Sequence, residues 1–200
     1  REVTPATGTL RIKVKLKSLA KAAGTIIVSF DGEITADDGP VYTFDTVFGY
    51  FKREALQNQV GLPVSDEQRA ALAQPCQAPV VDLSTQPAEY FGAGARLADP
   101  MLLMVDRITG RWPGGGAAEL GQWRGVKDVN PAEWYFKAHF FQDPVQPGSL
   151  GIEMLLQLLQ FGMLDLGLGK EAGPAARFEP AALHDAMTWR YRGQIIPTNK

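Results

Sequence analysis

Two residues in the stretch AHFFQDPVQPGSLGIEMLLQLLQ are suited to moving protons. His139 is one of two histidines in the chain, and imidazole is the side chain whose unperturbed pKa lies closest to neutrality. Glu153 follows fourteen residues later as the single acid of the apolar run 149–160. The structural alternatives are a core histidine among phenylalanines and an acid that simply favours a helix N-terminus. The pair nevertheless indicates a general base and a general acid.

The loop between these residues adds a third chemical feature. Pro144 and Pro147 restrict the residues before them to extended conformations, and Gly148 allows close backbone approach where a helix would begin. The free N–H groups of a helix N-terminus can hold a carbonyl oxygen as it becomes an oxyanion. The structural alternative for this Pro-Gly pair is a plain turn with no binding role. With His139 and Glu153, this loop favours removal of a proton alpha to a carbonyl and protonation of a leaving hydroxyl.

A helix is predicted over residues 149–166. At 3.6 residues per turn, Glu153, Gln157 and Gln160 fall on one stripe, and apolar residues cover most of the remaining surface. This pattern predicts a largely buried helix. Desolvation is then expected to raise the pKa of Glu153 toward the range of a proton donor.

The elements around this segment fall into two groups. Alternating apolar and basic residues at 10–17 predict a strand with one buried face, and the strands 25–35 and 41–51 extend it into an antiparallel meander. A short helix is expected at 53–59. Residues 61–97 are rich in proline and alanine and are interpreted as a surface linker, with one helix start at Ser65.

The second group holds the catalytic loop. Strands are expected within 100–110 and 117–129, followed by the segment 134–140 and the long helix, and 187–200 is interpreted as a further strand. No later strand is left to pair with 187–200 in this unit. The chain is therefore expected to be part of something longer.

Composition excludes several classes of function. Hydrophobic residues make up 45% of the chain and charged residues 21%, and the formal net charge of −2 offers no basic field for a nucleic acid. Cys76 is the single cysteine, so neither an internal disulfide nor a cysteine-based metal framework is expected. No membrane span or leader is recognisable, and a cytoplasmic protein is expected.

The segment 139–153, HFFQDPVQPGSLGIE, resembles the active-site segment of the beta-hydroxyacyl thioester dehydratases of the hot-dog fold. In that family a histidine is followed by Asp-Pro-Val, then Pro-Gly, then an acid fourteen positions on. Residues 100–110 and 190–200 resemble two strands of the same fold. The sequence of 146–160 looks most like that of the dehydratase domains of polyunsaturated fatty acid synthases and related polyketide synthases. The resemblance implies an α+β hot-dog fold, an antiparallel sheet wrapped around a central helix.

The resemblance also implies roles for the residues. His139 would take the C2 proton of a 3-hydroxyacyl thioester, and Glu153 would hold or protonate the departing C3 hydroxyl. The N–H of Gly148 would bind the thioester carbonyl, Gln157 would support the acid, and Phe140 and Pro147 belong to the same substrate-binding set. The family needs no metal or redox cofactor, and the substrate would arrive on the phosphopantetheine arm of acyl carrier protein.

Further partners follow from the same resemblance. Two hot-dog units, in cis or in a homodimer, place the histidine of one near the acid of the other, and other synthase domains would flank them. Residues 1–60 resemble the late strands of one unit and 98–200 the early part of the next. A tandem (double) hot dog and a single permuted unit both remain open.

One departure from the family pattern leaves rival functions open. The stand-alone dehydratases carry aspartate where this chain has Glu153, which is one methylene longer. The rivals are a non-catalytic hot-dog unit that shapes a neighbouring active domain, and a hot-dog thioesterase or isomerase.

Overall fold

The computed structural model describes residues 1–57, 61–181, 187–189, 191 and 193–199. The chain divides into two compact units. One contains residues 1–61 with 180–190, and the other contains residues 62–179 with 191–200. Each unit has a three-stranded sheet of its own.

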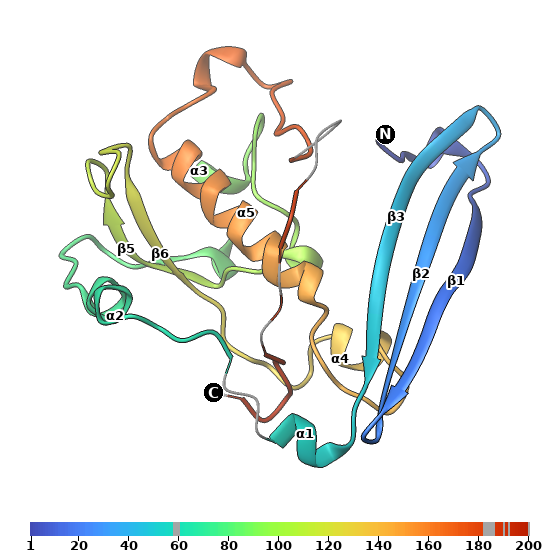
Figure 1. The fold of residues 1–200 in the computed structure, drawn as a ribbon. Helices are drawn as coiled ribbons and strands as arrows, with labels where there is room; N and C mark the ends of the chain where they lie inside the picture. The colour runs from blue at the N-terminus through green and yellow to red at the C-terminus, as the bar shows by residue number, and fades with distance from the viewer. Residues whose placement is uncertain (58–60, 182–186, 190, 192, 200) are drawn as a thin grey trace. The chain divides into compact units, whose positions relative to one another are not determined.

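The first unit is built on a meander of three long strands, β1 (Arg11–Ala22), β2 (Thr25–Ala36) and β3 (Gly39–Tyr50), which lie side by side in antiparallel order (Figure 1). Ala23 and Gly24 join β1 to β2, and both have positive φ, as a tight hairpin turn with the right-handed strand twist requires. A 3-10 turn (Pro5–Thr7) precedes the sheet, and the short helix α1 (Arg53–Gln57) follows it. The predicted meander and helix are confirmed, except that residues 58–60 lie outside the described residues.

One face of this sheet is almost wholly apolar. Residues directly opposite one another in an antiparallel ladder share a face, so Ile12 lies beside Ile34, and Ile34 beside Tyr42. The central strand is the best covered, and its Val28 is 6% exposed. The prediction of a buried face on β1 was wrong, because every residue of β1 is exposed, including apolar ones such as Ile12 at 65%.

The second unit combines a small sheet with a long helix. Strands β4 (Val81–Asp82), β5 (Arg107–Trp112) and β6 (Gln122–Val126) form an antiparallel sheet in that order. The helices are α2 (Asp66–Ala73), α3 (Ala88–Phe91), α4 (Tyr135–Ala138) and α5 (Gly148–Asp165), with 3-10 turns at Leu83–Thr85, Pro100–Leu102 and Lys170–Ala172. The predicted helix start at Ser65 is confirmed as the N-cap of α2, where its side chain accepts from the Gln68 N–H.

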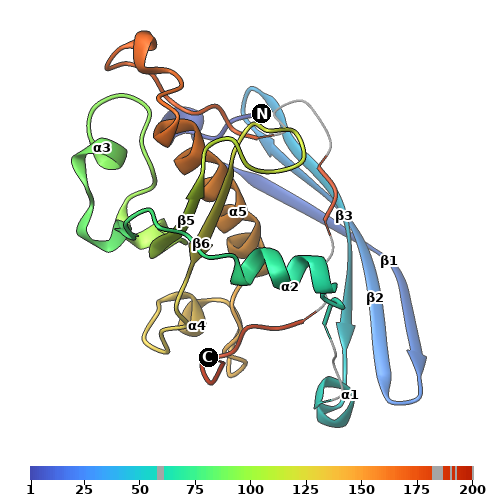
Figure 2. The same ribbon diagram turned by 90° about the vertical axis from the view of Figure 1, so that its left-hand side faces the viewer.

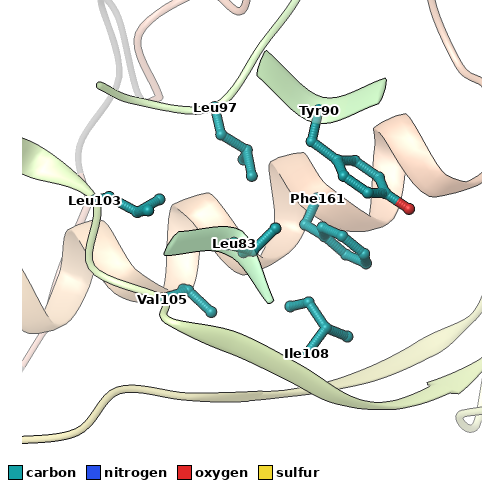
Figure 3. Packing of buried hydrophobic residues seen from close by; sticks show 7 residues of the cluster. All are labelled: Leu83, Tyr90, Leu97, Leu103, Val105, Ile108 and Phe161. Atoms are coloured by element: carbon teal, nitrogen blue, oxygen red, sulfur yellow. The ribbon is translucent and has the colours of Figure 1, made fainter. Parts of the chain in front are cut away.

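The core of this unit gathers around Phe161 of α5, as Figure 3 shows. The cluster comprises Leu83, Tyr90, Leu97, Leu103, Val105, Ile108 and Phe161. The first three come from residues 61–97. The interpretation of that range as a surface linker is therefore corrected for its second half, because proline and alanine content gave no sign that its isolated large apolar residues would be buried.

The helix α5 packs against β6 with one face (Figures 1 and 2). Phe161 is fully buried and Gln157 is 1% exposed on that side, whereas Leu155 and Leu159 are 58% and 61% exposed. The predicted helix is confirmed in its length and place. The prediction that it is largely buried was wrong, since a single sheet covers one side of a helix only.

A polar network fixes the C-terminal end of α5. The Asp165 carboxylate accepts hydrogen bonds from Trp123 Nε1 at 2.9 Å, Arg111 at 3.0 Å and the Tyr90 hydroxyl at 3.3 Å. Burial, followed by the nearby charge of Asp165, raises the pKa of Tyr90 to about 12. These bonds tie α5 to β5, β6 and α3.

The C-terminal segment is not the strand that was predicted for 187–200. Its described residues have no regular structure. The Gln146 N–H donates to the Ile195 carbonyl at 2.9 Å and links the segment to the loop before α5. A strand needs a continuous ladder of such bonds. The second histidine of the sequence, His184, for which a solvated loop position is expected, lies outside the described residues.

Candidate active site

His139 lies at the C-terminal end of α4 and is half-buried. Its Nδ1 is 3.0 Å from the carbonyl oxygen of Val145. A carbonyl oxygen can only accept, so this contact favours the tautomer with the proton on Nδ1 and leaves Nε2 with a free lone pair. The Phe140 ring stacks on the imidazole with centroids 3.9 Å apart. His139 thus has the geometry of an oriented base.

Packing holds the short helix α4 against the beginning of α5. Tyr135 and Phe136 are buried with Met104, and Leu150 and Met154 of α5 pack on the same cluster. Phe136 therefore belongs to the core. This cluster places the segment with His139 and the first turns of α5 in the same part of the unit.

The N-terminus of α5 begins at the predicted Pro-Gly pair. Pro147 is the N-cap, with polyproline-like backbone angles (φ −54°, ψ 129°), and no side chain caps the helix there. Gly148 is the first helical residue, and a Cβ on it would lie 2.3 Å from the Tyr191 ring. Only glycine therefore lets that ring lie against the helix start. The N–H groups of the first turn have no side-chain acceptor among the described residues.

Gln157 is the most constrained polar side chain of the site. Its Oε1 accepts from the Met104 N–H at 2.7 Å, and its Nε2 donates to the Leu102 carbonyl at 2.8 Å. The same Nε2 donates to Glu153 Oε1 at 2.8 Å, one turn earlier on the helix. Gln157 thus holds one oxygen of the Glu153 carboxylate from a fixed position.

A cavity of about 360 Å³ opens beside Glu153. Glu153 and Gln160 line it from α5, and the other walls come from residues 94 and 96–99 and from 176–178. Its charged lining includes Arg96 and Arg177. His139 is not among the lining residues. The structure therefore brings Glu153 and Gln157 together, and it leaves His139 outside the cavity that Glu153 lines.

Three groups of the site carry no signal in the sequence. The Val145 carbonyl, the Leu102 carbonyl and the Met104 N–H are backbone atoms, which every residue type supplies. Their role depends on the loop before β5 and the loop before α5 lying beside side chains of α4 and α5. That arrangement is visible in the folded chain alone.

Neither a metal cluster nor a membrane-spanning helix is found in the described part of the chain. Within it, no group of three or more histidine, cysteine, aspartate or glutamate side chains could hold a metal ion. None of the helices found there is long and apolar enough to cross a membrane.

Comparison with known proteins assigns the chain to a family. Residues 97–200 match the FabA-like domain, so the chain belongs to the FabA-like family of hot-dog dehydratases. Its mixed α+β structure, with antiparallel sheets and a long helix, agrees with that assignment.

A curated relative gives a more particular context. The chain is 32% identical over 189 residues to one of the subunits of the polyunsaturated fatty acid synthase of Thraustochytrium sp.. The match covers 86% of this chain and 12% of the relative. The chain thus spans about an eighth of the length of the protein it resembles.

Proposed function

We propose that this chain dehydrates 3-hydroxyacyl thioesters, carried on acyl carrier protein, to 2-enoyl thioesters in polyunsaturated fatty acid or polyketide biosynthesis. The contact of His139 Nδ1 with the Val145 carbonyl carries the proposal, because it leaves Nε2 free to accept a proton. The similarity to part of a polyunsaturated fatty acid synthase supports the biosynthetic context.

In the proposed reaction, His139 Nε2 removes a proton from C2 of the thioester. The electron pair of that C–H bond forms the C2–C3 double bond, and the C3–O bond breaks. The Val145 carbonyl orients the imidazole and stabilises the imidazolium that forms. The stacked Phe140 ring limits rotation of the imidazole and offers an apolar surface to the substrate.

Negative charge develops on the thioester oxygen as the C2 proton leaves. The Gly148 N–H, at the start of the eighteen-residue helix α5, would donate to that oxygen. Pro147 sets the polyproline-like backbone before the helix and keeps the first N–H groups of α5 free of a side-chain cap. Donors of this kind cost little reorganisation because the helix already fixes their direction.

The departing hydroxyl needs a proton to leave as water. Glu153 supplies it in this proposal, with Gln157 holding one carboxyl oxygen and leaving the other for the substrate. The extra methylene relative to aspartate moves the carboxyl group further from the helix. The bond from Gln157 supports a fixed direction for that longer side chain.

His139 and Glu153 would each act with the complementary residue of an adjacent hot-dog unit, in cis or in a homodimer. The absence of His139 from the lining of the Glu153 cavity supports this arrangement. Acyl carrier protein and the other synthase domains would be the remaining partners.

The test uses the full synthase chain with a 3-hydroxyacyl thioester and mass spectrometry. The wild type should release one water, whereas hydrolysis would free the thiol and isomerisation would leave the mass of an enoyl substrate unchanged. His139→Ala and Glu153→Gln should each abolish most of the water loss, and Lys13→Ala, an exposed residue of β1, should retain it. Full dehydration by His139→Ala would favour a non-catalytic unit, and full activity of Glu153→Gln would remove the acid assignment alone.

A further inference from the structure

A half-buried charge cluster lies outside the candidate active site. The Lys127 ammonium is 2.9 Å from Asp106 Oδ1 and 2.9 Å from Glu133 Oε1. The lysine side chain is 13% exposed and each acid 23%. Burial works to lower the pKa of Lys127, but its hydrogen bonds to the two carboxylates outweigh that effect and the pKa is raised. One cation therefore joins two acids from different segments.

Lys127 and Asp106 form a fixed corner at the end of the second sheet. Asp106 directly precedes β5 and Lys127 directly follows β6. The Asp106 N–H donates to the Val126 carbonyl at 2.8 Å, and Asp106 Oδ2 accepts from the Asp128 N–H at 2.8 Å. Arg107 pairs with Asp128 beside them. This corner gives the cluster a rigid base on the sheet.

Glu133 connects that corner to the segment carrying His139. The Phe136 N–H donates to the Glu133 carbonyl at 3.2 Å, and the His139 N–H donates to the Tyr135 carbonyl at 3.0 Å. The helix α4 between them has four residues, too few to be stable without tertiary contacts. Its position therefore depends on its anchors, which are the packing of Tyr135 and Phe136 beside α5 and, on its N-terminal side, the ion pair of Lys127 with Glu133.

We propose that Lys127, with Asp106 and Glu133, is a positioning residue that sets the place of His139 relative to the Val145 carbonyl. Without the ammonium, two carboxylates would face each other at low exposure and repel. Glu133 and the turn that begins α4 would then move away from the sheet. The continuous helical hydrogen bonds from Glu133 to His139 would pass that displacement to the imidazole.

This inference has a kinetic test and a spectroscopic test, and only the kinetic test rests on the proposed function. Lys127→Met removes the cation and keeps much of the stem, and Lys127→Met with Glu133→Gln also removes the repulsion. Lys137→Met is the matched control, because Lys137 is an exposed lysine of α4 with no ion pair among the described residues. Lys127→Met should lower kcat about 10- to 100-fold, as displacement by about 1 Å does, with a much smaller change in KM. The double variant should recover part of the loss, and Lys137→Met should match the wild type.

A spectroscopic readout tests the positioning without any activity. Residues 1–200 contain two histidines, and the difference between the ¹⁵N imidazole spectra of the wild-type chain and of a His139→Asn variant isolates the signals of His139. The wild type should show His139 with its proton on Nδ1. Lys127→Met should lose that single tautomer, and the double variant should regain it. This result stands even if His139→Ala leaves dehydration intact.

Two outcomes would overturn the proposal. One is an unchanged His139 tautomer in folded Lys127→Met, whatever its activity, and the other is equal loss in Lys127→Met and Lys137→Met. If Lys127→Met does not fold, Glu133→Leu decides the matter, since it keeps the Lys127–Asp106 pair and leaves no acceptor on residue 133 for the ammonium to hold. An unaltered kcat and His139 spectrum in that variant would refute the positioning role.

Discussion

Gln157 offers the sharpest test of the site's construction. Its amide is 1% exposed and bonds the Met104 N–H, the Leu102 carbonyl and the Glu153 carboxylate. Gln157→Met keeps the volume and the helix propensity nearly constant but cannot make these bonds. It leaves one buried N–H and one partly buried carbonyl unpaired, at about 1–3 kcal/mol each. The free energy of unfolding should therefore fall by about 2–6 kcal/mol.

Urea unfolding followed by tryptophan fluorescence measures this loss. Trp112, Trp123 and Trp134 lie in the unit that contains α5, so the signal reports mainly on that unit. Gln160→Met is the control, since Gln160 lies on the same helix and its side chain has no hydrogen bond among the described residues, and its change should stay within about 0.5 kcal/mol. Equal unfolding midpoints for the two variants would refute the assignment of Gln157 as the buried clamp on Glu153.

The remaining predictions concern Gly148 and Tyr90. Gly148→Pro removes the proposed oxyanion donor at a helix position that tolerates proline, so kcat should fall about 10²- to 10³-fold. The helical signal in far-UV circular dichroism should stay unchanged. The control Gly148→Ala adds the same Cβ beside Tyr191 but keeps the N–H, so its kcat should fall much less. The pKa of Tyr90 is raised to about 12, above the value of about 10 in an unfolded chain, so its contribution to stability is complete below about pH 10 and is lost as the pH rises toward 12. Urea midpoints across that window should fall more steeply for the wild type than for Tyr90→Phe, and parallel curves would contradict the shift.

Sequence periodicity was enough to predict the long regular elements, but it missed the short elements β4 and α3 and wrongly predicted a strand at 187–200. The alternation in residues 10–17 and the stripes of 149–166 predicted β1 and α5, because side chains repeat every 2 residues in a strand and every 3.6 in a helix. The same patterns did not predict burial. An apolar stripe is buried only where another layer packs on it, and that depends on segments far away in the sequence.

For the candidate site, too, the sequence predicts one part of the arrangement and the fold decides the other. The residue types alone identify the side chains that can donate or accept protons, His139 and Glu153, and the place of a helix N-terminus between them. How these side chains are held depends on the fold, through the Val145 carbonyl, through Gln157, which the loop before β5 fixes in place, and through the corner at Lys127. The difference arises because a side chain's chemistry is local, whereas its orientation comes from hydrogen bonds and charges that folding brings from other segments of the chain.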